Sequence, residues 1–169
     1  MTILIRFRAL LALACLFLAG CAVGSAPVSV SPSAAPDLSS AAGVCPVTEP
    51  AWAKPPEDAA VSGAPAYGYY FVNADRSMWA SAWWAEQEEA YLLAGEPGVK
   101  VGWFRPAGAT LEITGQRLDA AAPPLEAHIP CCYPTRFQAT GLTFPAEGCW
   151  QVSAQAAESA LSFVVWVEP

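Results

Sequence analysis

The side chains best suited to chemistry in this sequence are its six cysteines and its single histidine. His128 lies three residues before Cys131, which is followed directly by Cys132. An imidazole and two thiolates are ligands for soft cations such as Cu(I) and Zn(II), and two neighbouring thiols can also act as a redox pair. However, adjacent side chains on a strand point to opposite faces, and recognised zinc motifs separate paired ligands by two or more residues. We therefore expect no metal or other cofactor, and we keep a thiol-based metal or redox module at these residues as an alternative function.

Common catalytic motifs are absent from the sequence, which predicts that the protein is not an enzyme and has no catalytic residues. No Gly-x-Ser-x-Gly element accompanies the lone histidine, and the phosphate-binding and dinucleotide-binding glycine motifs are missing as well. Glu86, Glu88 and Glu89 offer carboxylates of the kind that glycosidases use. A run of glutamates is more typical of a solvated face, so we assign no catalysis to it.

Aromatic residues give the strongest indication of a binding function. The chain has seven tryptophans, and Trp83 and Trp84 follow Tyr69 in an aromatic-rich stretch. Aromatic faces bind sugar rings well because they combine apolar area with a small loss of conformational entropy. We predict that these three residues contribute to a ligand surface, with a carbohydrate- or peptidoglycan-binding accessory domain as an alternative function. The tryptophans expected to pack inside the fold are Trp79, Trp103, Trp150 and Trp166.

Charge and composition exclude several other classes of protein. The 169 residues contain 8 Lys and Arg against 15 Asp and Glu, for a net charge of −7, whereas a nucleic-acid partner requires a basic surface. The 16 prolines and 12 glycines interrupt the chain too often for a mostly helical fold. Apolar residues are concentrated at 9–19, in an uncharged run about eleven residues long, which is too short to span a membrane.

This apolar run belongs to a segment with the pattern of a secretory leader, because two arginines precede it and small residues end it. Residues 18–21, with the sequence Leu-Ala-Gly-Cys, resemble the lipobox of bacterial lipoprotein precursors. The resemblance implies diacylglycerol transfer to Cys21, cleavage after Gly20 and acylation of the new amino terminus. Residues 1–20 would then be a signal peptide, and several acyl chains would hold Cys21 in the lipid bilayer essentially permanently.

The segment after the predicted cleavage site cannot form a core. Residues 22–44 are almost wholly Ala, Ser, Val, Pro and Gly, so we expect 21–44 to be the lipidated cysteine and a disordered tether. Loss of the two leader arginines would take the net charge from −7 to −9. Position 22 is Ala rather than the Asp that retains lipoproteins at the inner membrane. The resemblance therefore implies the outer membrane in a host with two membranes, and otherwise the outer face of the plasma membrane.

Residues 45–169 are expected to form one all-β domain. Short runs of aromatic and β-branched residues recur between turn residues at 67–72, 78–82, 99–104, 110–114, 125–129, 136–142, 149–154 and 161–167. The last of these runs is apolar on both faces, which predicts a central strand. Residues 83–94 are predicted as a short helix or a charged loop. Eight strands at this spacing predict an antiparallel β-sandwich.

Gly148, Cys149 and Trp150 carry a second resemblance, within a stretch that covers 141–152. Further similar stretches are at 45–47, 100–105, 114–119, 123–125 and 161–167. Together they resemble a group of uncharacterised bacterial lipoproteins with a small immunoglobulin-like domain. This resemblance implies an immunoglobulin-like β-sandwich of seven to eight strands and a cell-envelope address, and it implies no activity.

The cysteines left after export would meet an oxidising compartment, which favours disulfides over free thiols. Setting aside Cys15 in the leader and the lipidated cysteine leaves four residues with three connectivities: Cys45, Cys131, Cys132 and Cys149. Neighbouring cysteines pair poorly, because consecutive Cα atoms lie about 3.8 Å apart and disulfides prefer about 5.5–6 Å. The resemblance implies a Cys45–Cys149 pair, which would leave Cys131 and Cys132 as a strained vicinal bridge or a dithiol.

The sequence thus predicts a membrane-anchored exported lipoprotein that serves as a binding, envelope or interaction module. Its expected partners are the lipid bilayer, through acylated Cys21, and a glycan or an envelope protein.

Overall fold

The computed structural model describes residues 44–56, 67–87, 92–131 and 133–169. The predicted signal peptide at 1–20, the lipidation site Cys21 and the tether up to residue 43 lie outside the described residues. The described part is an all-β antiparallel sandwich of two sheets stapled by a disulfide, which confirms the predicted fold class.

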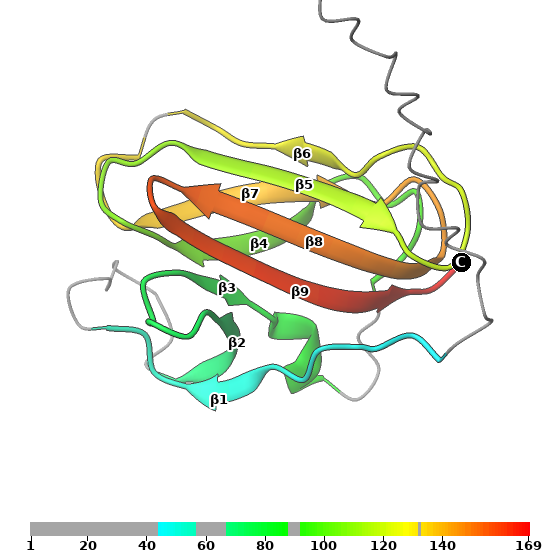
Figure 1. The fold of residues 1–169 in the computed structure, drawn as a ribbon, viewed down its shortest axis with the longest axis horizontal. Helices are drawn as coiled ribbons and strands as arrows, with labels where there is room; N and C mark the ends of the chain where they lie inside the picture. The colour runs from blue at the N-terminus through cyan, green and yellow to red at the C-terminus, as the bar shows by residue number, and fades with distance from the viewer. Residues whose placement is uncertain (1–43, 57–66, 88–91, 132) are drawn as a thin grey trace, which may run out of the picture. The chain divides into compact units, whose positions relative to one another are not determined.

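One sheet has six strands in the order β1-β2-β3-β4-β7-β6, and the other has three in the order β5-β8-β9. All pairings between these strands are antiparallel. Figure 1 shows the three-stranded sheet lying in front of β4 and β7. The strands are β1 (Ala51–Ala53), β2 (Gly68–Val72), β3 (Trp79–Ser81), β4 (Val99–Phe104), β5 (Leu111–Arg117), β6 (Glu126–His128), β7 (Phe137–Thr143), β8 (Gly148–Ala156) and β9 (Ser159–Val167).

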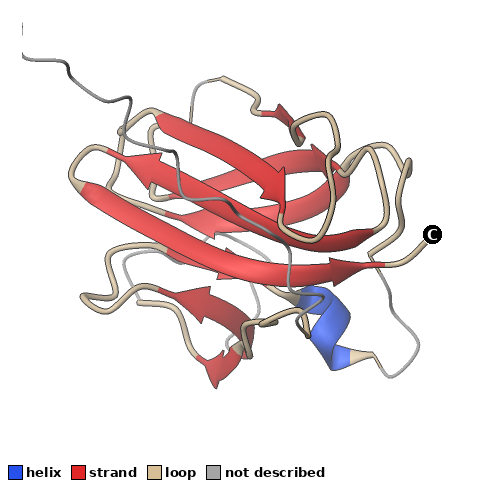
Figure 2. Cartoon of the chain, turned by 45° about the vertical axis from the view of Figure 1, so that its right-hand side comes forward, coloured by secondary structure: helices blue, strands red, loops and turns tan. Residues whose placement is uncertain are grey.

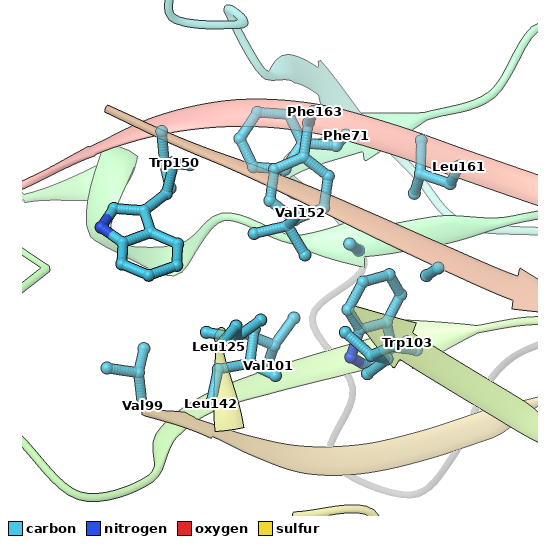
Figure 3. Close-up of a cluster of buried hydrophobic side chains, with 14 of the residues drawn as sticks. Phe71, Val99, Val101, Trp103, Leu125, Leu142, Trp150, Val152, Leu161 and Phe163 are labelled. Carbon is cyan, nitrogen blue, oxygen red and sulfur yellow. The ribbon is translucent and has the colours of Figure 1, made fainter. Parts of the chain in front are cut away.

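Alternating side chains of both sheets form the core between them. On β9 the buried residues are Leu161, Phe163, Val165 and Val167, as the alternation in the sequence predicts. Phe163 stacks on Phe71 of β2, with ring centroids 4.0 Å apart and an interplanar angle of 7°, so this pair joins the two sheets (Figure 3). Such aromatic burial is a large share of the free energy that stabilises a domain of this size.

Three of the four tryptophans predicted to be internal are fully buried, and each has a partner for its indole N–H. Trp103 donates to Thr140 Oγ1 at 2.9 Å, Trp150 donates to the Ala146 carbonyl at 2.8 Å, and Trp79 donates to the Arg76 carbonyl at 2.9 Å. The prediction for the fourth tryptophan is wrong. Trp166 is 45% exposed, because it lies on the outer face of β9.

All eight predicted strands are present, but the prediction that 161–167 is central is wrong. β9 is an edge strand that pairs only with β8 in its sheet. Other segments cover part of its free edge: Val164 N–H donates to Thr48 Oγ1, the Val164 carbonyl accepts from Thr48 N–H, and Leu93 forms an isolated bridge with Glu168. This cover is one way in which proteins protect an exposed strand edge.

In the segment 83–94, predicted as a short helix or a charged loop, the described residues form one helical turn. A 3₁₀ helix, η2 (Trp83–Glu86), is the blue helix in Figure 2. Leu92 and Leu93, at the end of the predicted segment, are not helical, since Leu93 forms the bridge to Glu168. Glu88 and Glu89 lie outside the described residues, and Glu86 is exposed.

Candidate functional site

The disulfide between Cys45 and Cys149 is the predicted pair. Its Cα atoms are 5.6 Å apart, and 104 residues separate the two cysteines in the sequence. Cys149 is buried on β8, opposite Trp166 of β9. The disulfide therefore fixes the beginning of the described domain to the three-stranded sheet.

The alternative thiol site at His128, Cys131 and Cys132 does not offer two free thiols, because Cys131 is disulfide-bonded. Cys131 is exposed and takes part in a disulfide, and Cys132 lies outside the described residues. His128 is exposed on β6, where it pairs with Gly141 of β7. Within the described part of the chain, no three His, Cys, Asp or Glu side chains are grouped so that they could hold a metal ion.

The predicted ligand residue Tyr69 belongs to an aromatic cluster at β1 and β2, together with Tyr67 and with Trp52, a residue that no sequence pattern indicated. Trp52 is 59% exposed and Tyr67 is 55% exposed. Their rings stack with an interplanar angle of 14° and a centroid distance of 6.4 Å, and Trp52 also contacts Tyr69 edge to face at 5.1 Å. We call Trp52, Tyr67 and Tyr69 the β1–β2 cluster.

Sheet register explains how this cluster forms. Trp52 lies directly opposite Tyr69 in the antiparallel β1–β2 pair, and side chains at such positions share one face of the sheet. Tyr67 stands diagonally across from Trp52, one residue before β2 begins. Gly68, between the two tyrosines, has no side chain to stand on the opposite face, where Glu86 Oε1 would lie 3.0 Å from an added Cβ. The cluster thus sits on a hydrogen-bonded sheet edge rather than on an isolated loop.

Trp83 belongs to a second surface, a cavity of about 410 Å³ that it lines together with Glu96, Gly98, Val99 and Lys100. We call this cavity the Trp83 groove. Trp83 is 39% exposed, and its indole N–H donates to the Lys100 carbonyl at 2.8 Å, which fixes the ring against β4. The groove combines an aromatic wall with one carboxylate and one ammonium group, and its volume is within the range of small-molecule sites.

The structure separates the three predicted ligand residues. Tyr69 lies in the β1–β2 cluster, whereas Trp83 lines the groove. Trp84 is half-buried and packs on the core, with its ring centroid 6.2 Å from that of Phe71. Trp83 and Trp84 are in edge-to-face contact at 5.9 Å. Among the described residues, no ring contact connects the β1–β2 cluster with this tryptophan pair.

Tyr70 is adjacent to the cluster but cannot serve as its ligand-facing hydroxyl. It is buried on the opposite face of β2, where it contacts Trp79 and Phe104 edge to face at 5.7 and 6.0 Å. Burial raises the pKa of the Tyr70 phenol, and the negative charge of Glu86 raises it further. The phenol therefore stays neutral at physiological pH.

The remaining predicted site, the lipidation cysteine Cys21, lies outside the described residues. Among those that are described, no helix is both long and apolar enough to cross a membrane. Comparison of the chain with protein-family models, with curated proteins and with solved structures finds no match.

Proposed function

We propose that this protein is an exported lipoprotein, anchored in the cell envelope through acylated Cys21, whose β-sandwich is a binding or interaction module. The observation that carries the binding role is the β1–β2 cluster. There, two large aromatic rings are more than half exposed and stacked on each other at the edge of an ordered sheet. Rigid aromatic side chains of this kind provide most of the contact energy in many binding surfaces, because little side-chain entropy is lost when they bind.

Two features support export and anchoring. The leader pattern ends in the lipobox-like residues 18–21, and a Cys45–Cys149 disulfide is typical of oxidising compartments. Residues 22–44 would serve as a tether between the acylated cysteine and the sandwich. The address follows from Ala22, which favours the outer membrane in a host with two membranes and the outer face of the plasma membrane in a host with one.

Metabolic labelling with radioactive palmitate tests the anchor. The wild-type chain should incorporate label and fractionate with membranes. The Cys21→Ser variant should lose both properties, whereas the matched leader variant Cys15→Ser should retain both. Label that persists in Cys21→Ser, or an unlabelled wild-type chain, would contradict the lipoprotein assignment.

A second candidate function, carbohydrate or peptidoglycan binding, is favoured by the Trp83 groove. The exposed ring of Trp83 offers an apolar surface to the C–H face of a sugar. Glu96 lines the same cavity and can accept hydrogen bonds from sugar hydroxyls, while Lys100 can donate them. These are the chemical groups that fix the orientation of a ligand in a mostly apolar site.

Titration of the full chain with soluble peptidoglycan fragments, followed by tryptophan fluorescence, tests this candidate. We expect a saturable change that Trp83→Ala abolishes. Trp166→Ala is the matched control, because Trp166 is similarly exposed but lies on β9 and does not line the groove. A flat titration would contradict carbohydrate binding, and so would an equal loss of signal in both variants.

A further inference from the structure

Arg105 is the one charged side chain that is buried among the residues the structure describes, and only 2% of its surface is exposed. It follows directly after β4, and its backbone N–H donates to the carbonyl of Arg136 at 3.0 Å. Burial of an ionised group costs free energy unless a charge of opposite sign or a full set of hydrogen bonds compensates it. The groups that hydrogen-bond to the Arg105 guanidinium therefore show whether its buried charge is compensated.

All partners of the Arg105 guanidinium are neutral. Nη1 donates to the Pro106 carbonyl at 2.9 Å, and Nη2 donates to the Tyr133 carbonyl at 3.0 Å and to Gln138 Oε1 at 2.8 Å. Nε is buried and has no hydrogen-bond partner. No carboxylate pairs with this side chain in the described ranges, although the chain as a whole has a net charge of −7. Desolvation lowers the pKa of Arg105, but a guanidinium remains charged at physiological pH.

Arg105 lines a cavity of about 250 Å³ between the ends of the two sheets. The walls are largely apolar, with Ala109, Leu111, Ile129 and Pro130, and the remaining lining residues include Gln138 and Thr110. None of the residues that line the cavity is acidic. The cavity thus brings an uncompensated buried cation next to an apolar space.

A second arginine, Arg136, is hydrogen-bonded to the backbone of Arg105. Arg136 Nε donates to the Arg105 carbonyl at 3.3 Å, so the two residues are hydrogen-bonded to each other in both directions through the Arg105 backbone. In surroundings of low dielectric constant, an anion beside the buried guanidinium of Arg105 interacts with it far more strongly than it would in water. The buried positive charge therefore favours an anionic ligand, and the apolar walls of the cavity favour a ligand with an apolar body.

We propose that the Arg105 cavity is a binding site for a small organic monocarboxylate with an apolar body. The carboxylate would accept hydrogen bonds from the guanidinium, and the apolar body would pack against Leu111, Ile129 and Pro130. The cavity is smaller than the range of about 300–1,000 Å³ for drug-sized ligands, which restricts the site to compact acids. This inference is independent of the β1–β2 cluster and of the Trp83 groove, since it uses none of their residues.

The test is a ¹H–¹⁵N NMR titration of the purified full chain with butyrate and benzoate, with butyramide and benzamide as neutral analogues of the same shapes. We expect saturable shifts of the Arg105 Nε–H signal and of the cavity-lining amides, with a dissociation constant of about 1 mM or tighter for at least one carboxylate. The neutral amides should bind at least about tenfold more weakly, because they cannot form charge-assisted hydrogen bonds. Inorganic phosphate should not compete.

Arg105→Met should abolish carboxylate binding, but the loss of its three hydrogen bonds can also unfold the protein. A second variant avoids this difficulty. Ala109→Leu fills part of the cavity and leaves Arg105 in place, so it should weaken binding by about tenfold or more. The matched control is Ala107→Leu in the same turn, since Ala107 is exposed and does not line the cavity. The proposal is overturned if neither carboxylate binds, if the amides bind equally well, if phosphate is preferred, or if both leucine variants bind alike.

Discussion

Cys45 and Cys149 are joined by a disulfide whose Cα atoms are 5.6 Å apart, although 104 residues separate them in the sequence. This bond fastens the chain to β8 directly before the segment in which Thr48 hydrogen-bonds to the free edge of β9. The covalent link and the edge hydrogen bonds thus act on the same short stretch, which leads from the predicted tether into β1.

Removal of this disulfide should lower stability strongly. A cross-link that closes a loop of about 100 residues restricts the unfolded chain by an amount worth about 4.7 kcal/mol in loop-entropy models. We expect the Cys45→Ser/Cys149→Ser double variant to lose about 3–5 kcal/mol of unfolding free energy in urea, under conditions that leave the Cys131 disulfide intact. A loss below about 1 kcal/mol would mean that packing alone holds this segment in place.

Gly148 should tolerate alanine much less well than Gly108. Both residues have positive φ, 118° and 70° respectively, which is unfavourable for any residue with a Cβ. An added Cβ at Gly148 would also lie 2.6 Å from Arg117 Nε and 2.7 Å from Asp119 Oδ2, whereas at Gly108 it would meet nothing within 4 Å. Gly108→Ala should cost about 1 kcal/mol, and Gly148→Ala about 2 kcal/mol or more, by chemical denaturation. Equal losses would show that the contacts of Arg117 and Asp119 are irrelevant.

Asp119 should make stability depend on pH in the acid range. Arg117 Nε donates to Asp119 Oδ1 at 2.7 Å, and this hydrogen bond holds the pKa of the carboxyl below its ordinary value. A carboxyl whose pKa is lower in the folded state stabilises the fold above the unfolded-state pKa of about 3.9, and its contribution is lost as the pH falls through the folded pKa. Asp119→Asn should therefore lose stability at pH 7 and show a shallower decline below pH 4. Parallel pH profiles for the variant and the wild type would contradict this account.

The exposed and internal tryptophans should differ sharply in what their removal does. Trp52→Ala should change the unfolding free energy by about 1 kcal/mol or less, because more than half of the side chain is already in water. Trp103→Ala should cost about 3–5 kcal/mol, since it empties a fully buried position and leaves the Thr140 hydroxyl without its indole donor. A large loss for Trp52→Ala would indicate a structural role for the β1–β2 cluster.

The runs of aromatic and β-branched residues between turns predict eight of the nine strands that the structure describes, but not how these strands are arranged. The alternation in 161–167 identifies Leu161 and Phe163 as inward-facing, yet it cannot tell that Thr48, more than a hundred residues earlier, covers the edge of β9. Apolar residues on both faces of a strand are typical of a central strand, and this is why the prediction that Trp166 is internal is wrong. Whether the edge of a strand is covered depends on segments that are far away in the sequence, so a local pattern cannot predict it.

The candidate sites were predictable only in part, for similar reasons. β1 has three residues, two of them alanines, so it carries almost no strand signal, and the contact between Trp52 and Tyr69 depends on its register. The composition did indicate an excess of aromatic residues. No local pattern marks Arg105 as buried, because it directly follows an apolar strand like many solvent-exposed residues at strand ends. The side chain of Arg105 is held by Gln138 of β7 and by Tyr133 in the loop before β7, and both are about thirty residues away in the sequence.

The central claim, that the sandwich is carried on a lipid anchor at the cell envelope, is tested most directly by the mass of the amino-terminal peptide of the protein isolated from membranes. Our account predicts a peptide that begins at Cys21 and carries both a diacylglycerol group on its thiol and an acyl chain on its amino group. A peptide that retains residues 1–20, or one that contains an unmodified Cys21, would contradict it.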